Sequence, residues 1–173
     1  ASSPMWNYMS EDEFVRHFDA LADALFRHCF FRVFDREAAK DLVQETFLRA
    51  WDYLAKGQRV DNMPAFLYRV ATNLIIDESR KKKTRSLEGL QDQGFDVRED
   101  HHLEIYKSAE LRDDVGRALR VLNELDPKHR EVVVLRYINE LDPKEIAEII
   151  GETENAVSVR LHRAIKKLRA LLT

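Results

Sequence analysis

A group of polar and basic side chains near the carboxyl end of the chain has the types and spacing that DNA reading requires. Their spacing predicts a helix on which they lie beside or opposite an apolar stripe containing Val157, Leu161 and Ala164. Amide, hydroxyl and cationic groups on an exposed helix can contact base edges and phosphates in the major groove. The predicted contact residues are Asn155, Ser158, Val159, Arg160, His162, Arg163 and Lys166.

A short helix and a tight turn are predicted just before this face. Asp142 followed by Pro143 is typical of a helix start, and Gly151 can adopt the left-handed conformation that ends a helix. The small Ala147 lets two helices approach each other, and Val157 fills the angle between them. These positions predict a helix-turn-helix. A simple packing hairpin with a solvated outer face is the alternative.

A second cationic group precedes an acidic segment. Residues 86–110 hold seven acidic and two basic residues. Two positive patches joined by a negative segment suggest two contacts with a polyanion. Compensation of a helix dipole is the alternative role for part of the basic run. This run consists of Arg80, Lys81, Lys82, Lys83 and Arg85.

Helices must position all of these groups. The 173 residues include five Gly and four Pro, too few for a sandwich or barrel with many tight turns. Apolar residues at every third or fourth position predict helices over Glu11–Val33, from Asp35 to Gly57, and from Asn62 into the basic run. Trp51 falls on the apolar side of the second helix, so we expect it to pack in the core.

The segment between the two cationic groups separates two predicted domains. We predict an all-α protein in which two small helical domains, residues 11–85 and 108–173, are joined by a flexible acidic linker, residues 86–107. The second domain contains Glu-Leu-Asp-Pro-Lys twice, starting at Glu124 and Glu140. Each copy predicts a helix start, because Asp can cap a helix whose first residue is Pro. Apolar stripes of this domain are expected to include Leu111 and Leu171.

Other chemistry is poorly supported. The single cysteine, Cys29, excludes a disulfide framework and fits a reducing compartment. No apolar run is long enough to span a bilayer, so we expect no membrane insertion. His101 and His102 lie near several acids, but one segment is weak evidence for a metal site. The sequence has no Gly-rich phosphate loop and no plausible Ser-His-Asp arrangement, so we assign no catalytic residue, cofactor or metal.

Three segments resemble regions of bacterial sigma factors, in the correct order. Asp-Leu-Val-Gln-Glu-Thr-Phe at residues 41–47, followed by Ala50-Trp51, resembles region 2.2. Residues 65–74 with Asp77 are similar to regions 2.3 and 2.4, and residues 135–164 resemble region 4. Two domains with only a linker between them, lacking regions 1.1 and 3, resemble the extracytoplasmic-function (ECF) group of the sigma-70 family.

The resemblance implies a promoter-specificity subunit that binds RNA polymerase core. Its first domain would open the minus-10 region, and its helix-turn-helix would read the minus-35 duplex. The second helix would dock on the clamp helices of the β′ subunit. The residues that match this docking face are Asp41, Leu42, Gln44 and Glu45.

The resemblance also implies residues for the minus-10 element. Asn73 and Asp77 match positions near the pocket that captures a flipped base of the non-template strand. Recognition of single-stranded DNA commonly combines such contacts with a basic groove. The basic run from Arg80 to Arg85 would then hold nearby phosphates.

The implied partners are RNA polymerase core, bound through the β′ clamp helices and the β flap, promoter DNA, and an anti-sigma protein of the kind the family commonly has. The implied location is the cytoplasm. Ser158 and Val159 depart from the family pattern, so the minus-35 base preference of other family members does not apply to this chain. A conventional helix-turn-helix repressor or activator is one alternative, but it leaves residues 41–47 unexplained. A metal-dependent nucleic-acid enzyme centred on His101 and His102 is a remote alternative.

Overall fold

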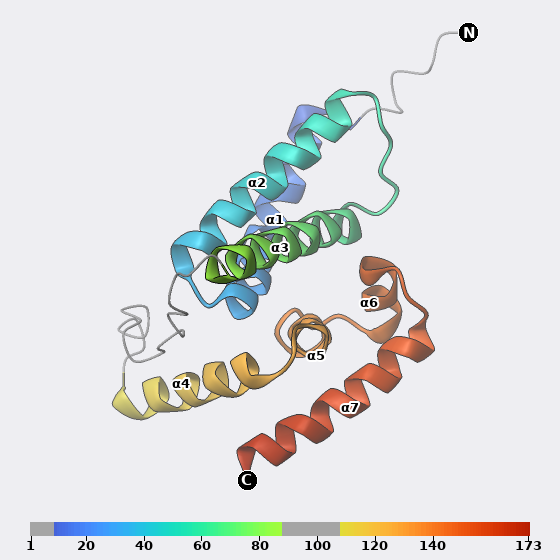
Figure 1. Cartoon of the computed structure of the whole chain (residues 1–173). Helices are drawn as coiled ribbons and strands as arrows, with labels where there is room; N and C mark the ends of the chain where they lie inside the picture. The colour runs from blue at the N-terminus through green and yellow to red at the C-terminus, as the bar shows by residue number, and fades with distance from the viewer. Residues whose placement is uncertain (1–8, 88–107) are drawn as a thin grey trace, which may run out of the picture.

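The computed structural model describes residues 9–87 and 108–173, which contain helices and no strand (Figure 1). The helices are α1 (Glu11–Val33), α2 (Arg36–Ala55), α3 (Met63–Leu87), α4 (Ala109–Glu124), α5 (Pro127–Val133), the π-helical turn η4 (Val134–Ile138), α6 (Pro143–Ile150) and α7 (Glu154–Leu172). The predicted all-α class is confirmed. Most of the predicted linker, including His101 and His102, lies outside the described residues.

Polar caps start the first two helices. The Ser10 hydroxyl accepts a hydrogen bond from the Glu13 backbone, and the Glu13 carboxylate accepts one from the Ser10 backbone. Phe34, with a φ of 57°, ends α1. Asp35 then accepts a hydrogen bond from the Ala38 backbone at 3.0 Å and starts α2. The predicted bounds of α1 and the Asp35 cap are therefore confirmed.

Helices α1, α2 and α3 pack around a shared apolar core that contains Leu25, Leu67 and Ala71, all fully buried. Trp51 lies at the edge of this core. Its ring centroid is 5.1 Å from that of Phe14, yet Trp51 remains 39% exposed. The prediction that Trp51 packs in the core therefore holds only for the side of the ring that faces Phe14.

Helix α3 continues through the whole basic run. It ends at Leu87 and so includes Ser86 and Leu87, which we had assigned to the linker. No Gly or Pro lies between Pro64 and Gly89 to interrupt it, and Lys and Arg are good helix formers. The charges of the basic run consequently have the fixed angular spacing of a helix.

The second group of helices also begins at the predicted caps. Asp126 and Asp142 accept hydrogen bonds from the backbones of His129 and Glu145, at 3.1 and 2.8 Å. A Pro follows each cap at the first helical position. Both predicted helix starts are confirmed.

The apolar stripes of this group are shorter than we expected. Val157, Leu161 and Ala164 are buried, whereas Leu111 and Leu171 are 45% and 40% exposed. Each exposed leucine lies in a terminal turn of its helix, in α4 and α7 respectively. The prediction that these two leucines belong to the buried stripes is wrong.

The two groups of helices contact each other. Helix α6 packs beside α3 (Figure 1), and η4 contacts α1. The Asn139 side chain after η4 donates a hydrogen bond to the Ala24 carbonyl of α1 at 2.9 Å. Segments separated by more than 100 residues are thus in direct contact.

Candidate nucleic-acid interface

Helices α6 and α7 form the helix-turn-helix that the sequence predicts. Gly151 has a φ of 72°, and its N–H and that of Glu152 both donate to the Ala147 carbonyl, at 2.9 and 3.1 Å. The Thr153 hydroxyl then caps α7 by accepting a hydrogen bond from the Ala156 backbone at 3.1 Å. Val157 is completely buried between the two helices. The turn therefore fixes the direction in which α7 leaves α6.

One face of α7 is open to solvent. Because Val157, Leu161 and Ala164 anchor the opposite side, the polar positions must point outward. The exposed predicted contact residues are Asn155, Ser158, Val159, His162, Arg163 and Lys166. Between Asn155 and Lys166, helix α7 thus presents amide, hydroxyl, imidazole and cationic groups on its exposed surface, which we call the α7 face.

Arg160 differs from the other predicted contacts on α7. Its guanidinium is half-buried and donates to both carboxylate oxygens of Glu152, at 2.6 and 2.7 Å. This ion pair, in which the single nitrogen Nη2 contacts both oxygens, connects the turn after α6 to the second turn of α7. Arg160 therefore stabilises the turn. A DNA phosphate that bound Arg160 would have to share the guanidinium with the Glu152 carboxylate or displace that carboxylate.

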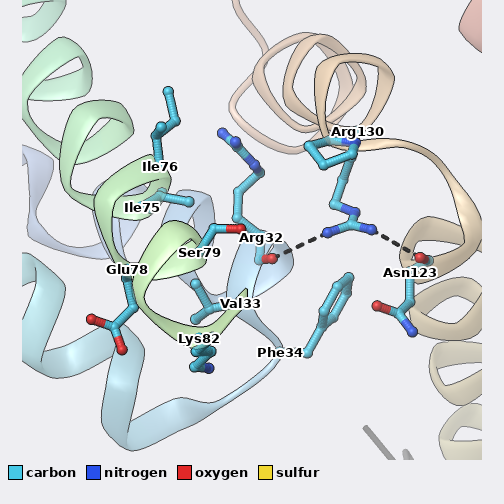
Figure 2. A pocket seen from close by; sticks show the side chains of 11 residues that line it. Arg32, Val33, Phe34, Ile75, Ile76, Glu78, Ser79, Lys82, Asn123 and Arg130 are labelled. Carbon is cyan, nitrogen blue, oxygen red and sulfur yellow. Dashed lines mark hydrogen bonds between the residues drawn. The ribbon is translucent and has the colours of Figure 1, made fainter. Parts of the chain in front are cut away.

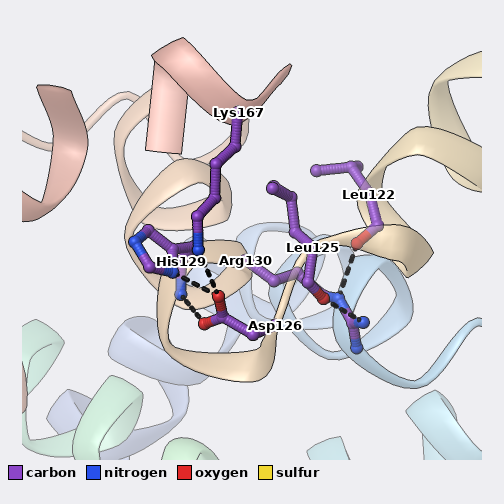
Figure 3. Close-up of polar contacts among 6 residues, drawn as sticks. All are labelled: Leu122, Leu125, Asp126, His129, Arg130 and Lys167. Carbon is purple, nitrogen blue, oxygen red and sulfur yellow. Dashed lines mark hydrogen bonds and ion pairs between the residues drawn. The ribbon is translucent and has the colours of Figure 1, made fainter. Parts of the chain in front are cut away.

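An ion pair connects α7 to the start of α5 (Figure 3). Asp126 accepts hydrogen bonds from the His129 ring at 2.5 Å and from the Lys167 ammonium at 3.1 Å. Partial burial raises the pKa of Asp126, but hydrogen bonds from the His129 backbone, Lys167 and the His129 ring outweigh it and lower the pKa to about 2. The carboxylate is consequently charged at neutral pH.

Arg130 closes the carboxyl end of α4 (Figure 3). Its guanidinium donates to the carbonyls of Leu122, Asn123 and Leu125, each at 2.8 Å. The Leu122 carbonyl also accepts a hydrogen bond from the Leu125 N–H at 3.2 Å, and the Arg130 cation adds further donors at this end and opposes the helix dipole. Burial and the neighbouring charge of Arg32 lower the pKa of Arg130 to about 10, which keeps it cationic at neutral pH.

A groove between α2 and α3 brings together two sets of predicted residues. Its volume is about 610 Å³. Asp41 and Glu45 from α2 line it together with Asp77, Arg80 and Lys81 from α3. Predicted polymerase-docking residues and predicted minus-10 residues therefore share what we call the α2–α3 groove.

Sequence reasoning missed two residues of this groove, and a third, the predicted residue Leu42, is buried beside it. Arg49 and Glu78 also line it, and Arg49 donates to Glu45 at 2.9 Å. Helical spacing is the signal in the sequence that points to them, because Arg49 is four residues after Glu45 and Glu78 is three residues before Lys81. Leu42 lines the groove but is only 8% exposed, because it belongs to the core between the helices. Leu42, which matches a docking position in the family motif, thus packs in the core of the three helices.

The remaining predicted residues of the first domain are dispersed. Gln44 and Asn73 are exposed outside the α2–α3 groove. Lys82 and Lys83 are both exposed, and Lys82 also lines a different cavity that includes Arg130 (Figure 2). The side chain of Arg85 lies outside the described part of the structure.

No metal site accompanies these surfaces in residues 9–87 and 108–173, where His, Cys, Asp and Glu form no group of three that could hold an ion. His28 and Cys29 are buried, as we expected. Burial and the Arg32 charge lower the pKa of His28 to about 3, and burial raises the pKa of Cys29 to about 12. None of the described helices is long and apolar enough to cross a membrane.

The fold and these surfaces define a transcription factor with one helix-turn-helix and a separate charged helical domain. The family model for sigma-70 region 2 matches residues 17–85, and that for sigma-70 region 4 matches residues 116–168. The chain is 33% identical to the ECF sigma factor SigL of Mycobacterium tuberculosis over 162 residues, covering 90% of this chain and 86% of SigL. It is also 32% identical to the ECF sigma factor BldN of Streptomyces coelicolor over 171 residues, covering 93% of this chain and 61% of BldN.

The chain belongs to the ECF RNA polymerase sigma factors of the sigma-70 family. It is thus a promoter-specificity subunit of RNA polymerase, and the repressor and metalloenzyme alternatives are not favoured. The fold is also similar to that of the sigma factor RpoE from Bartonella quintana, solved in complex with the anti-sigma factor NepR. The TM-score is 0.77 at 24% identity, over 93% of this chain and 97% of that one. This likeness supports the two-domain all-α fold.

Proposed function

We propose that this sigma factor contacts a promoter through two separate surfaces. The α7 face contacts the minus-35 duplex, and α3 contacts the minus-10 strand with Asn73, Asp77 and the basic run. The observation that carries the first assignment is the exposure of six polar or groove-sized side chains opposite the buried Val157. The observation behind the second is the row of charges on the continuous helix α3.

We assign polymerase docking to the exposed side of α2. Asp41 and Glu45 are acidic, and they border the α2–α3 groove next to Asp77. An acidic face suits a basic coiled-coil partner such as the β′ clamp helices implied by the family. Binding of core beside the minus-10 residues would position them for strand opening.

The test is transcription by core polymerase reconstituted with this chain on a promoter library randomised at both elements. We expect transcripts to arise from promoters that share a two-part motif, and we expect the chain without core to select no such motif. Selection of the same motif by the chain alone would favour a conventional DNA-binding regulator. Transcription without any selected motif would contradict the assignment of both surfaces.

We further propose that residues 11–85 and 108–173 are separate folding units, with the linker between them. Limited proteolysis should cut first within residues 86–107, because this segment is acidic and weakly patterned. The chain would act by binding alone, without a catalytic residue, in the cytoplasm with polymerase. The RpoE–NepR complex suggests an anti-sigma protein as a further partner.

A further inference from the structure

One side of α7 carries three cations along the border of the α7 face. Arg160, Arg163 and Lys167 are separated by three and four positions, so they follow one another along the same side of the helix. A row of cations at the border of a recognition helix suits the DNA backbone, whose phosphates lie along both edges of the major groove. We call these three residues the basic edge.

Acids of the same group of helices already neutralise two of the three cations. Arg160 contacts both carboxylate oxygens of Glu152 through Nη2, at 2.6 and 2.7 Å. Lys167 contacts Asp126 at 3.1 Å (Figure 3). Arg163 is exposed and forms no ion pair with any residue that the structure describes. The basic edge therefore has three positive charges, of which one is unpaired.

The two acids differ in what else they do. Asp126 also caps α5 by accepting a hydrogen bond from the His129 backbone, so the start of that helix requires it. The Glu152 side chain, by contrast, has Arg160 as its only hydrogen-bond partner among the described residues. The two side chains are 35% and 19% exposed, and ion pairs that water reaches contribute little stability. The main effect of the Glu152 carboxylate is therefore on the charge that Arg160 presents.

We propose that Glu152 competes with the DNA backbone for Arg160, and that this competition limits the affinity of the α7 face for the minus-35 duplex. The inference rests on the proposed two-surface function. A phosphate that approaches Arg160 must displace the carboxylate or lie beside it, and like charges at this distance repel each other. Binding consequently gains less from Arg160 than from Arg163, where a phosphate replaces only water.

The competition affects both salt dependence and promoter choice. Each protein cation that neutralises a phosphate releases counterions from the DNA, which makes binding weaker as salt is added. At Arg160 the displaced carboxylate stays close to the phosphate and attracts a cation of its own, which offsets this release. Backbone contacts carry no sequence information, so a weakened backbone contact leaves a larger share of the binding free energy to base contacts. Glu152 therefore lowers affinity for all sequences and favours discrimination among promoters.

Removal of the competing charge tests the proposal. Glu152→Gln keeps the length of the side chain and loses its charge. Holoenzyme assembled from core polymerase and this variant is titrated with a promoter recovered from the randomised library, at salt concentrations between roughly 50 and 200 mM. We expect binding to become roughly threefold tighter or more. The slope of the logarithm of the binding constant against the logarithm of the salt concentration should become steeper by up to about one unit.

Glu154→Gln is the matched control. Glu154 is exposed two positions beyond Glu152 and forms no ion pair with any described residue, so its loss removes the same formal charge without releasing Arg160. This variant should tighten binding and steepen the slope by less than Glu152→Gln does. Arg160 must carry the difference: in an Arg160→Gln background, Glu152→Gln should have no larger effect than Glu154→Gln.

A purely structural ion pair predicts the opposite sign. If the pair served only to hold the turn, Glu152→Gln would loosen the turn and weaken binding; urea denaturation of each variant measures this loss of stability separately. Binding by Glu152→Gln that is no tighter than that by Glu154→Gln would overturn the inference. An equal gain from Glu152→Gln in the Arg160→Gln background would also overturn it. The proposed function fails separately, if Arg163→Ala leaves promoter binding by holoenzyme unchanged.

Discussion

Lys167, in the second half of the recognition helix α7, donates to Asp126, the residue that caps α5, with 3.1 Å between Nζ and the carboxylate oxygen. The two residues are 41 positions apart in the sequence. One carboxylate thus starts a helix and also restrains the helix that presents the α7 face. The stability of α5 and the orientation of the α7 face are therefore linked at Asp126.

Replacing Asp126 should separate its two roles. Asp126→Asn keeps a capping oxygen but loses the charge that attracts Lys167, so we expect a small loss of stability. Asp126→Ala also loses the cap and should cost about 0.5–2 kcal/mol more. Urea denaturation at pH 7 measures both. Equal losses for Asn and Ala would contradict the capping role.

The Asp126 charge also predicts a pH dependence. Its pKa is about 2 in the folded chain, below the ordinary value of 3.8. The stabilisation is therefore complete above about pH 4 and is lost as the pH falls toward 2, because the unfolded chain binds the proton first. In Asp126→Asn this part of the pH profile should flatten, which denaturation between pH 4 and 2 can detect.

Gly151 predicts a purely conformational effect. Its φ is 72°, and a Cβ built there would meet no atom within 4 Å. Gly151→Ala should consequently cost about 1–2 kcal/mol from backbone strain alone. Gly151→Asn should cost less, because Asn tolerates the left-handed region. A cost for Asn that exceeds that for Ala in thermal unfolding would indicate a steric effect instead.

The helix ends could be predicted from the sequence because caps are local. Asp35, Asp142 and Gly151 act on residues two to four positions away, so their chemistry is visible in a short window. The same locality made the exposure of the α7 face predictable, because residue types repeat there at helical spacing.

The contacts between distant elements could not be predicted in the same way. Arg130 as a cap for α4 and Arg69 as a cap for α6 depend on which helices pack together. The burial of Leu42 could not be predicted for a related reason: matching a motif gives a position on the helix but not which side of that helix the core covers. Arg160 lies at the border of the α7 face, where Glu152 determines its direction.

His28 predicts a loss of stability in mild acid. It is buried beside Thr72 and Arg32, and its pKa is lowered from 6.5 to about 3 by burial first and then by the Arg32 charge. The unfolded chain therefore binds a proton between pH 6.5 and 3 that the folded chain excludes. Stability should fall with decreasing pH in this range, by up to about 1.4 kcal/mol per pH unit.

The variant His28→Gln tests this assignment, because its amide can still reach the Thr72 hydroxyl without titrating. Between pH 6.5 and 4, a range above the Asp126 transition, its stability should depend less on pH than that of the unsubstituted chain. An identical pH profile for the two chains in this range would show that other groups cause the dependence.

Charge reversal on α2 tests the docking surface. In Asp41→Lys/Glu45→Lys, we expect a lower affinity for core polymerase with unchanged helicity, because both side chains are at the surface. Leu42→Ala is the contrasting variant, since removal of a buried leucine should cost about 2–5 kcal/mol of stability. Fluorescence titration with core and circular dichroism separate the two effects. Unchanged affinity for core in the double variant would remove this assignment.

The α7 face predicts a division between affinity and specificity. Arg163 is exposed next to the apolar side of the helix, so we expect it to contact a phosphate. Arg163→Ala should weaken minus-35 binding for all sequences alike. It should also reduce, by about one unit, the slope of the logarithm of the binding constant against the logarithm of the salt concentration. Arg160→Ala should act differently, because it also removes the brace to Glu152 and should destabilise the helix-turn-helix.

Ser158 is predicted to act on base preference. It is exposed beside the apolar stripe of α7, so Ser158→Arg introduces a long donor at the surface of the helix without disturbing the core. Because side-chain contacts to base edges discriminate by about 1–3 kcal/mol each, the preferred minus-35 bases should change. The measurement is transcription of a randomised minus-35 library by holoenzyme carrying each variant, with Arg163→Ala as the comparison. Unchanged preference for Ser158→Arg combined with altered preference for Arg163→Ala would mean that α7 is rotated in the groove relative to our assignment.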